Sequence, residues 1–364
     1  MLLASASLVA CSAVHRHVSP SVIVDTDVMD DDMAAIAALF LSGGRAVPVG
    51  FTVVGTGGCS SAQAGAHTLA RFLKAVNREG IPIRLGSNMP QDHGNHSFSP
   101  ATRHRSDLIP DIYNLPNASV PGTNTTESAA EYLVRITRAR PGELTLLAIG
   151  PMTNVAEALR LDRDFLGRLR RFVWMGGGIA TVANDTPHNA SEWNFWCDTH
   201  AARRALAAVQ TASFAPGATG MSGLDATAAA VVDSTLVDAL QAASEAAATT
   251  RPASWRMAAS VLLDAARTAS TWRSSLLYDA VAALDAALGV GPAGGEAALT
   301  ELFVRRELPI TVLVNDSLVD GRTVVDQQAG AMMTVNMKMQ RDVFRALLLR
   351  LLQASAHAGA GLGA

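Results

Sequence analysis

Residues 21–32, with the sequence SVIVDTDVMDDD, decide the fold of this chain. The segment opens with a β-branched run that predicts a buried strand over Ser21–Thr26, and an apolar helical pattern follows over residues 33–40. Five aspartates lie within eight positions where the two predicted elements meet. A strand followed at once by a helix indicates the first unit of a parallel α/β sheet. The aspartates would then lie at the carboxyl end of the strand, where open α/β sheets bind their ligands.

The aspartate cluster itself predicts a metal site. Crowded carboxylates repel one another, and a bound cation is the usual way to hold them together. No Cys or His stands within this segment, and oxygen ligands alone favour a hard ion, Ca²⁺ or Mg²⁺, over zinc. Asp30 on its own also fits a solvated residue in the first turn of a helix. The clustering of the other four indicates function: Asp25, Asp27, Asp31 and Asp32.

Strands and helices continue to alternate through the first half of the chain. This alternation predicts an α/β fold with a doubly wound, mostly parallel central sheet and helices on both faces, in a single domain. Residues 89–125 are rich in Pro, Asn, His and Ser and are expected to form a long surface loop. Residues 176–194 are expected to be irregular, and the Ala-rich residues 226–269 to form a helical lobe over the site. The other predicted strands are 47–54, 81–85, 144–149 and 172–175, and the other predicted helices are 62–77, one opened by a capping box at 128–131, and 154–161.

Composition limits the classes of partner. The chain has 364 residues, a formal net charge of −3 and only two lysines, and its arginines form no basic stripe. Nucleic acid is therefore not expected as a partner. Cys11, Cys59 and Cys197 form no CxxC pair, so neither a zinc ribbon nor a disulfide framework is indicated.

The two ends of the chain are expected to lie outside the folded domain. Residues 1–14 are apolar, too short to span a bilayer, and similar to the central region of a signal peptide. We therefore expect a signal peptide or disordered N-terminus over residues 1–20, one domain over residues 21–353 and a flexible tail over residues 354–364. If the apolar segment is a signal peptide the protein is secreted or periplasmic, and otherwise cytoplasmic. No later segment indicates a stable membrane span.

Six segments, taken in order, resemble the inosine–uridine preferring nucleoside hydrolase family. Asp25, Asp27, Asp31 and Asp32 meet the family's Asp-x-Asp-x-x-x-Asp-Asp pattern after the first strand. Each of the other five segments is a weak signal alone, but together the six cover nearly all of the chain. Those five are residues 149–156 (IGPMTNVA), 173–178 (VWMGGG), 191–198 (SEWNFWCD), 277–280 (LYDA) and 321–326 (GRTVVD).

The resemblance implies calcium-dependent hydrolysis of the N-glycosidic bond of ribonucleosides, by a homodimer or homotetramer. It implies that Asp27, Asp32, Asp279 and the backbone carbonyl of Ile149 hold Ca²⁺, whose preferred ligands are such oxygens. Asp27 would also deprotonate the attacking water. As in other glycoside hydrolyses, the transition state would resemble an oxocarbenium ion. From the residues alone, Asp279 is equally compatible with a helix N-cap.

The resemblance also assigns the sugar side of the site. Asp31, Glu192 and Asn194 would bind ribose hydroxyls, with Asn184 as a further contributor. Asp25 would support the metal ligands through hydrogen bonds. Glu192 and Asn194 are two positions apart, so an extended segment would point both side chains to one face.

Two departures from the family concern the sugar side and the base side. Thr56 stands where many members carry an Asn, which weakens one expected ribose contact. Tyr278 stands where the family has a His that is a candidate acid for the leaving base, and a tyrosine hydroxyl, with its high pKa, is a poorer acid. Tyr278 remains the catalytic candidate, with His93, His96 and His104 in the long polar segment as substitutes.

Two other functions remain open at this point. One is a non-catalytic calcium- or ribose-binding relative that has lost turnover, which the changes at Thr56 and Tyr278 would fit. The other is a haloacid-dehalogenase-like phosphohydrolase, which also opens with a strand and Asp-x-Asp. Met29 stands where that family has Thr or Val, lysines are nearly absent and no Gly-Asp pair exists, so this alternative is weaker.

Overall fold

The computed structural model describes residues 21–353, apart from residues 45, 92–97, 121–125, 182, 185, 187–188, 272–274, 290–294 and 316–317. The predictions for residues 1–20 and 354–364, and for His93 and His96, lie outside the described residues.

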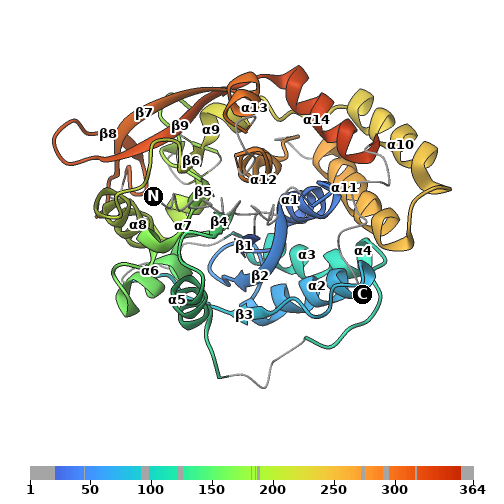
Figure 1. Cartoon of the computed structure of the whole chain (residues 1–364), viewed down its shortest axis with the longest axis horizontal. Helices are drawn as coiled ribbons and strands as arrows, with labels where there is room; N and C mark the ends of the chain where they lie inside the picture. Colours follow the sequence, from blue (N-terminus) through green and yellow to red (C-terminus); the bar gives the residue numbers. More distant parts are fainter. Residues whose placement is uncertain are drawn as a thin grey trace, which may run out of the picture.

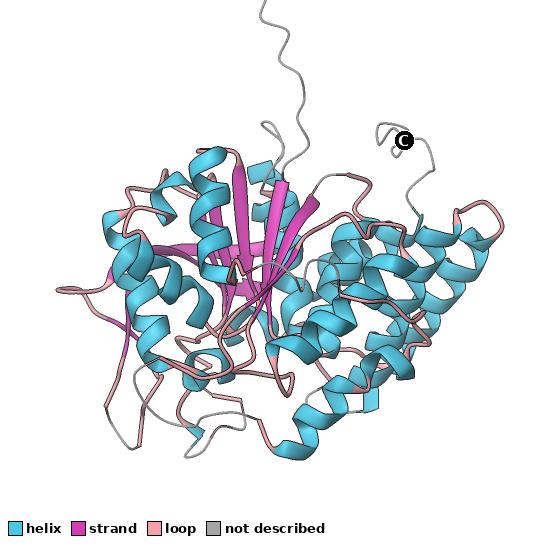
Figure 2. Cartoon of the chain, turned by 90° about the horizontal axis from the view of Figure 1, so that it is seen from below, coloured by secondary structure: helices cyan, strands magenta, loops and turns pink. Residues whose placement is uncertain are grey.

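The described strands form one sheet of nine, in the order β3-β2-β1-β4-β5-β6-β9-β7-β8. All neighbours from β3 to β9 are parallel, and β7 is antiparallel to both β9 and β8. The predicted α/β fold with a mostly parallel sheet is therefore confirmed (Figures 1 and 2). The strands are β1 (Ser21–Thr26), β2 (Val47–Val53), β3 (Ile83–Leu85), β4 (Leu144–Ala148), β5 (Arg171–Met175), β6 (Thr219–Ser222), β7 (Phe303–Val312), β8 (Thr323–Val325) and β9 (Ala331–Met339).

Helices cover both faces of this sheet, as predicted (Figure 1). On one face α1, α2 and α12 pack on the strands, with α11 packed on α1, and on the other face lie α5, α6 and α8. The helices are α1 (Asp30–Leu41), α2 (Ala62–Ala75), α3 (Pro100–Asp107), α4 (Ile109–Ile112), α5 (Ala129–Ala139), α6 (Thr153–Leu161), α7 (Trp193–Cys197), α8 (Thr199–Thr211), α9 (Leu224–Thr227), α10 (Ser234–Ala248), α11 (Ala253–Thr271), α12 (Tyr278–Leu288), α13 (Gly295–Leu302) and α14 (Arg341–Gln353), with a 3₁₀ turn, η1, at Leu166–Arg168. No described helix is both long and apolar enough to cross a membrane.

Strand β1 is central because its side chains are apolar toward both faces. Val22 and Val24 belong to the core beneath α1, whereas Ile23 belongs to the core beneath α5 and α6. All six residues of the strand are buried, as expected for a parallel strand covered on both sides. Since β2 lies on one side of β1 and β4 on the other, the chain reverses direction across the sheet at this strand. Such a reversal opens a crevice at the carboxyl ends of the strands.

The prediction of a long loop over residues 89–125 is wrong for its described part, which contains α3 and α4. Ser99 caps α3 by accepting the backbone N–H of Thr102 at 3.2 Å, and Pro100 occupies its first turn. Helix α3 has no apolar face, because Ser106 is its only buried residue. Charged contacts hold it instead, among them Arg105 with Asp30 at 2.6 Å. Hydrophobic periodicity cannot report a helix that is held in this way.

Candidate active site

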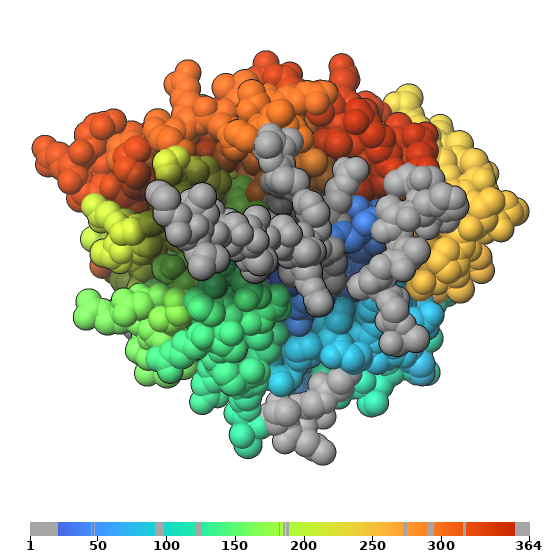
Figure 3. All heavy atoms as spheres, in the orientation of Figure 1, coloured from blue at the N-terminus to red at the C-terminus, as the bar shows by residue number. Residues whose placement is uncertain are grey.

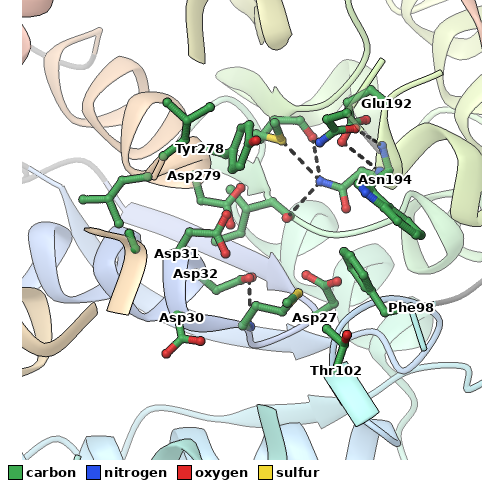
Figure 4. A pocket seen from close by; sticks show the side chains of 18 of the residues that line it. Asp27, Asp30, Asp31, Asp32, Phe98, Thr102, Glu192, Asn194, Tyr278 and Asp279 are labelled. Carbon is green, nitrogen blue, oxygen red and sulfur yellow. Dashed lines mark hydrogen bonds between the residues drawn. The ribbon is translucent and has the colours of Figure 1, made fainter. Parts of the chain in front are cut away.

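A cavity of about 250 Å³ opens beside the carboxyl ends of β1 and β4 (Figure 4). Nine of the predicted site residues line it, whereas Asp25 does not. These residues are Asp27, Asp31, Asp32, Ile149, Asn184, Glu192, Asn194, Tyr278 and Asp279.

Three carboxylates converge at one end of the cavity. Asp31 and Asp32 in the first turn of α1 and Asp279 in the first turn of α12 place oxygens within 4.8 Å of one another. Both helix N-termini point at this cluster, and helix N-termini stabilise negative charge. Asp279 is not the N-cap of α12, because Leu277 holds that position. The geometry therefore brings Asp31 into the tight group, while Asp27 and Ile149 line the same cavity.

Asp32 is oriented by the loop that precedes α1. The Thr26 hydroxyl donates to its Oδ1, and the Met29 backbone N–H donates to its Oδ2 at 2.9 Å. These two donors fix the carboxylate from behind, so that it keeps one orientation toward Asp279.

Asp27 is held by the loop that follows β2. The Gly58 backbone N–H donates to Asp27 Oδ2 at 2.5 Å. The approach depends on Gly57, since a Cβ there would lie 2.0 Å from the same oxygen. On the other side Val28 has φ of 56°, a left-handed conformation that is costly for a β-branched residue. The position of Asp27 thus depends on the strained turn at Val28 and on the close approach of Gly57.

Asp25 lies behind the cavity wall. Its Oδ1 accepts the Thr52 hydroxyl at 2.6 Å and the Asn154 Nδ2 at 2.7 Å, while its Oδ2 has no described partner. Burial raises the pKa of Asp25 to about 7. The residue ties β1 to β2 and α6, which suits a support for the loop bearing Asp27.

The four carboxylates around the cavity carry raised pKa values. Burial is the main cause for Asp27, Asp31, Asp32 and Asp279, and the neighbouring aspartates add repulsion for all but Asp32. Among the described residues no Lys, Arg or His forms an ion pair with any of the four. Asp30 differs, because it is buried against Arg105 at 2.6 Å, so the idea that it is a solvated residue is wrong. Buried carboxylates that lack a cationic side chain, with only oxygen donors, fit a hard divalent cation.

The opposite wall is built on α7. Glu192 is its N-cap and accepts the backbone N–H groups of Asn194 at 2.8 Å, Phe195 at 3.1 Å and Gly177 at 2.9 Å. Asn194 Nδ2 donates to the carbonyls of Ile149 and Met175, both at 3.2 Å. The predicted extended segment is wrong, because the capping carboxylate starts a helix at this point.

Burial raises the pKa of Glu192 to about 7 from an ordinary value of 4.5. The folded chain therefore binds more protons than the unfolded chain between these values, and the free energy of unfolding should fall as pH rises through this window. One pKa unit corresponds to about 1.4 kcal/mol, so the loss is on the order of 3 kcal/mol. Urea unfolding in the presence of chelator, from about pH 5 to pH 8, should show this slope in the wild type and a smaller slope in Glu192→Gln. Equal slopes would contradict the assignment.

The residues at which the chain departs from the family separate in the structure. Tyr278 lines the cavity beside Asp279. Thr56 does not; its hydroxyl lies 2.9 Å from that of Thr153. His104 is exposed on α3 and is not part of the cavity wall.

Sequence reasoning missed a second group of wall residues. Phe98 stacks on Trp193 with ring centroids 4.2 Å apart and planes inclined by 22°. Trp193 stands inside a segment already singled out, but Phe98 and Thr102 stand in the polar segment, where no periodic signal marks them. The missed residues with the clearest roles in the wall are Asp30, Phe98, Thr102, Met175, Trp193 and Thr268.

Comparisons with known sequences agree on one family. The sequence profile of the inosine-uridine preferring nucleoside hydrolases matches residues 22–348. Probable uridine nucleosidase 2 of Oryza sativa subsp. japonica is 35% identical over 185 residues, which are 50% of this chain and 51% of that protein. Pyrimidine-specific ribonucleoside hydrolase RihB of Escherichia coli O139:H28 is 30% identical over 190 residues, 50% of this chain and 54% of that protein. The chain thus spans about half the length of the curated relatives it matches.

Solved structures share the fold. The plant nucleoside hydrolase PpNRh1 superposes with a TM-score of 0.69 at 20% identity, covering 93% of this chain and 100% of that chain. An inosine-guanosine nucleoside hydrolase gives 0.70 at 20% identity, covering 92% and 99%.

Proposed function

Because the chain belongs to the inosine-uridine preferring nucleoside hydrolase family, we propose that it hydrolyses the N-glycosidic bond of ribonucleosides, releasing free base and ribose. One observation carries the proposal. The cluster formed by Asp31, Asp32 and Asp279 faces, across one cavity, a wall in which Asn194 presents a polar side chain (Figure 4). This arrangement suits a sugar bound by its hydroxyls.

The proposed cofactor is Ca²⁺, held by Asp27, Asp32, Asp279 and the carbonyl of Ile149. The donor set supports this choice, since all of its atoms are oxygens. The Ile149 carbonyl already accepts Asn194 Nδ2, and a carbonyl oxygen has a second lone pair for a metal. When bound, the cation would acidify a water and hold ribose hydroxyls.

Asp27 is suited to accept the proton of the attacking water. Gly58 occupies its Oδ2, and its Oδ1 has no partner among the described residues. The water oxygen bonds to the anomeric carbon, the bond to the base breaks, and the bonding electrons leave with the base nitrogen. Positive charge that develops on the ribosyl ring is stabilised by the surrounding carboxylates. Asp31 and Asn194 hold the ribose in place for this attack.

The leaving base must be neutralised, and Tyr278, which lines the cavity where the resemblance expects a His, is the candidate acid. If no stronger acid acts, substrates with good leaving groups should react far faster than natural nucleosides. We expect p-nitrophenyl riboside to exceed inosine in kcat by at least about a hundredfold, which corresponds to about 3 kcal/mol. Steady-state kinetics on both substrates measure this. Comparable rates would reveal an acid other than Tyr278.

Ribose release from a panel of nucleosides, with and without chelator, tests the proposed function. Release that stops with chelator and returns with Ca²⁺ supports a calcium-dependent hydrolase. Tight nucleoside binding without release would instead favour a non-catalytic ribose-binding relative. Phosphate release from p-nitrophenyl phosphate would favour the phosphohydrolase alternative.

A further inference from the structure

Helix α3 lies across the cavity from the carboxylate cluster. Figure 4 shows Phe98 and Thr102 on the side away from Asp31 and Asp279. If the sugar is bound at the carboxylate end, the group attached to its anomeric carbon must extend toward another wall. Phe98 and helix α3 form such a wall.

Arg103 fixes this helix to the loop that also holds Asp27. Its Nη2 donates to the carbonyls of Gly55 at 2.8 Å and Ser60 at 2.9 Å, and its Nε donates to the Cys59 carbonyl at 2.9 Å. The backbone N–H of Gly58, in the same loop, is the donor to Asp27. The guanidinium therefore fixes α3 to the loop that donates to Asp27.

Arg105 fixes the helix to the start of α1. It pairs with Asp30 at 2.6 Å, and the Tyr113 hydroxyl donates to the same carboxylate. Asp30 directly precedes Asp31 and Asp32. The two arginines thus attach α3 to the loop that holds Asp27 and to the first turn of α1.

Thr102 is a polar group that this attachment places in the wall. Its Oγ1 lies 3.0 Å from Ser99 Oγ. A hydroxyl can donate one hydrogen bond and accept two, so Thr102 keeps capacity for a partner in the cavity. It lies one position before Arg103, whose contacts fix the register of the helix.

We propose that α3 is the base-contacting wall of this site, with Thr102 as a specificity-determining contact and Arg103 and Arg105 as positioning residues. The inference rests on the proposed nucleoside hydrolysis and names the part of the chain that selects among bases. Bases with a hydrogen-bonding edge within reach of Thr102 are preferred over bases that lack it. Phe98, stacked on Trp193, supplies apolar surface beside this contact.

Thr102→Val tests the contact, because valine keeps the shape and removes the hydroxyl. The variant should lose about tenfold in kcat/KM on the best natural nucleoside, as expected for one hydrogen bond, while p-nitrophenyl riboside changes less than twofold. The ratio of kcat/KM for uridine to kcat/KM for inosine should also differ between Thr102→Val and the wild type. An unchanged ratio would overturn the inference while ribose release by the wild type upheld the hydrolase function.

Arg105→Gln and Arg105→Lys test the positioning role. The glutamine variant should raise KM for nucleosides at least about fivefold with a smaller change in kcat, and lysine, which keeps a charge for Asp30, should restore most of the KM. Arg135→Gln is the matched control, since Arg135 pairs with Glu127 outside the cavity wall. Equal effects of both Arg105 variants on KM and kcat would overturn the assignment. If the wild type shows no turnover, the dissociation constants of uridine and inosine, measured by calorimetry for the wild type and the same variants, are compared instead.

Discussion

Asp32→Ala should abolish tight binding of the divalent cation and lower kcat/KM for nucleosides at least about a thousandfold, a loss of about 4 kcal/mol at the transition state. Asp32 lies at the centre of the cluster, within 4.8 Å of Asp31 and Asp279. Its carboxylate is pre-oriented by Thr26 and Met29, so no neighbouring side chain can replace it by a simple rotation. Elemental analysis after dialysis gives the metal content, and ribose release gives the rate.

The matched control is Asp238→Ala, which removes an exposed carboxylate from α10. It should keep the metal content and the activity of the wild type. Asp32→Asn guards against misfolding of the alanine variant, because an amide keeps the size of the side chain and removes its charge. Stoichiometric calcium retained in both Asp32 variants would refute the metal assignment.

We expect 2′-deoxynucleosides to be cleaved at least about a hundredfold more slowly than ribonucleosides, a loss of about 3 kcal/mol. Asn194 explains the size of this effect. Both of its amide hydrogens point to backbone carbonyls, those of Ile149 and Met175, and its Oδ1 has no partner among the described residues. A buried acceptor that loses a substrate hydroxyl is left unsatisfied, and such sites discriminate strongly. Paired measurements of kcat/KM on uridine and 2′-deoxyuridine give the ratio.

Asn194→Ala should lower kcat/KM and reduce this discrimination without releasing the cation. Asn184→Ala provides a comparison variant in the same wall. The Oδ1 of Asn184 already accepts the Trp193 backbone N–H at 3.0 Å. Equal turnover of ribo- and deoxynucleosides by the wild type would show that the sugar contacts are misassigned, even if the hydrolase function held.

The first βα unit could be predicted from sequence because local chemistry determines it. The strand at Ser21–Thr26 is β-branched and apolar to both faces, and the aspartates that end it stand next to one another in the chain. Helix α3 could not be predicted in this way. Arg103 is held by carbonyls more than 40 positions earlier, and no periodicity records such a contact.

The wall around Glu192 shows a different limit. The alternation of polar and aromatic residues indicated an extended segment, but the pattern could not report where the carboxylate of Glu192 would point. That carboxylate accepts three backbone N–H groups, and these bonds select a helix start over a strand. Two of these donors, Asn194 and Phe195, belong to the helix that Glu192 caps, and the third, Gly177, lies in another segment.

The carboxylate cluster also brings together two parts of the chain that are far apart in sequence. Asp31 and Asp32 come from the first helix, and Asp279 comes from a helix more than 200 residues later in the chain. The proposed cation, bound to Asp32 and Asp279, would be a reversible cross-link that closes a very long loop, and its binding free energy would add to the stability of the folded state alone. Helices α1 and α12, which pack side by side, would otherwise be pushed apart by their own charges. On the proposed metal assignment, the free concentration of the ion would therefore set how firmly the early and late parts of the chain are joined.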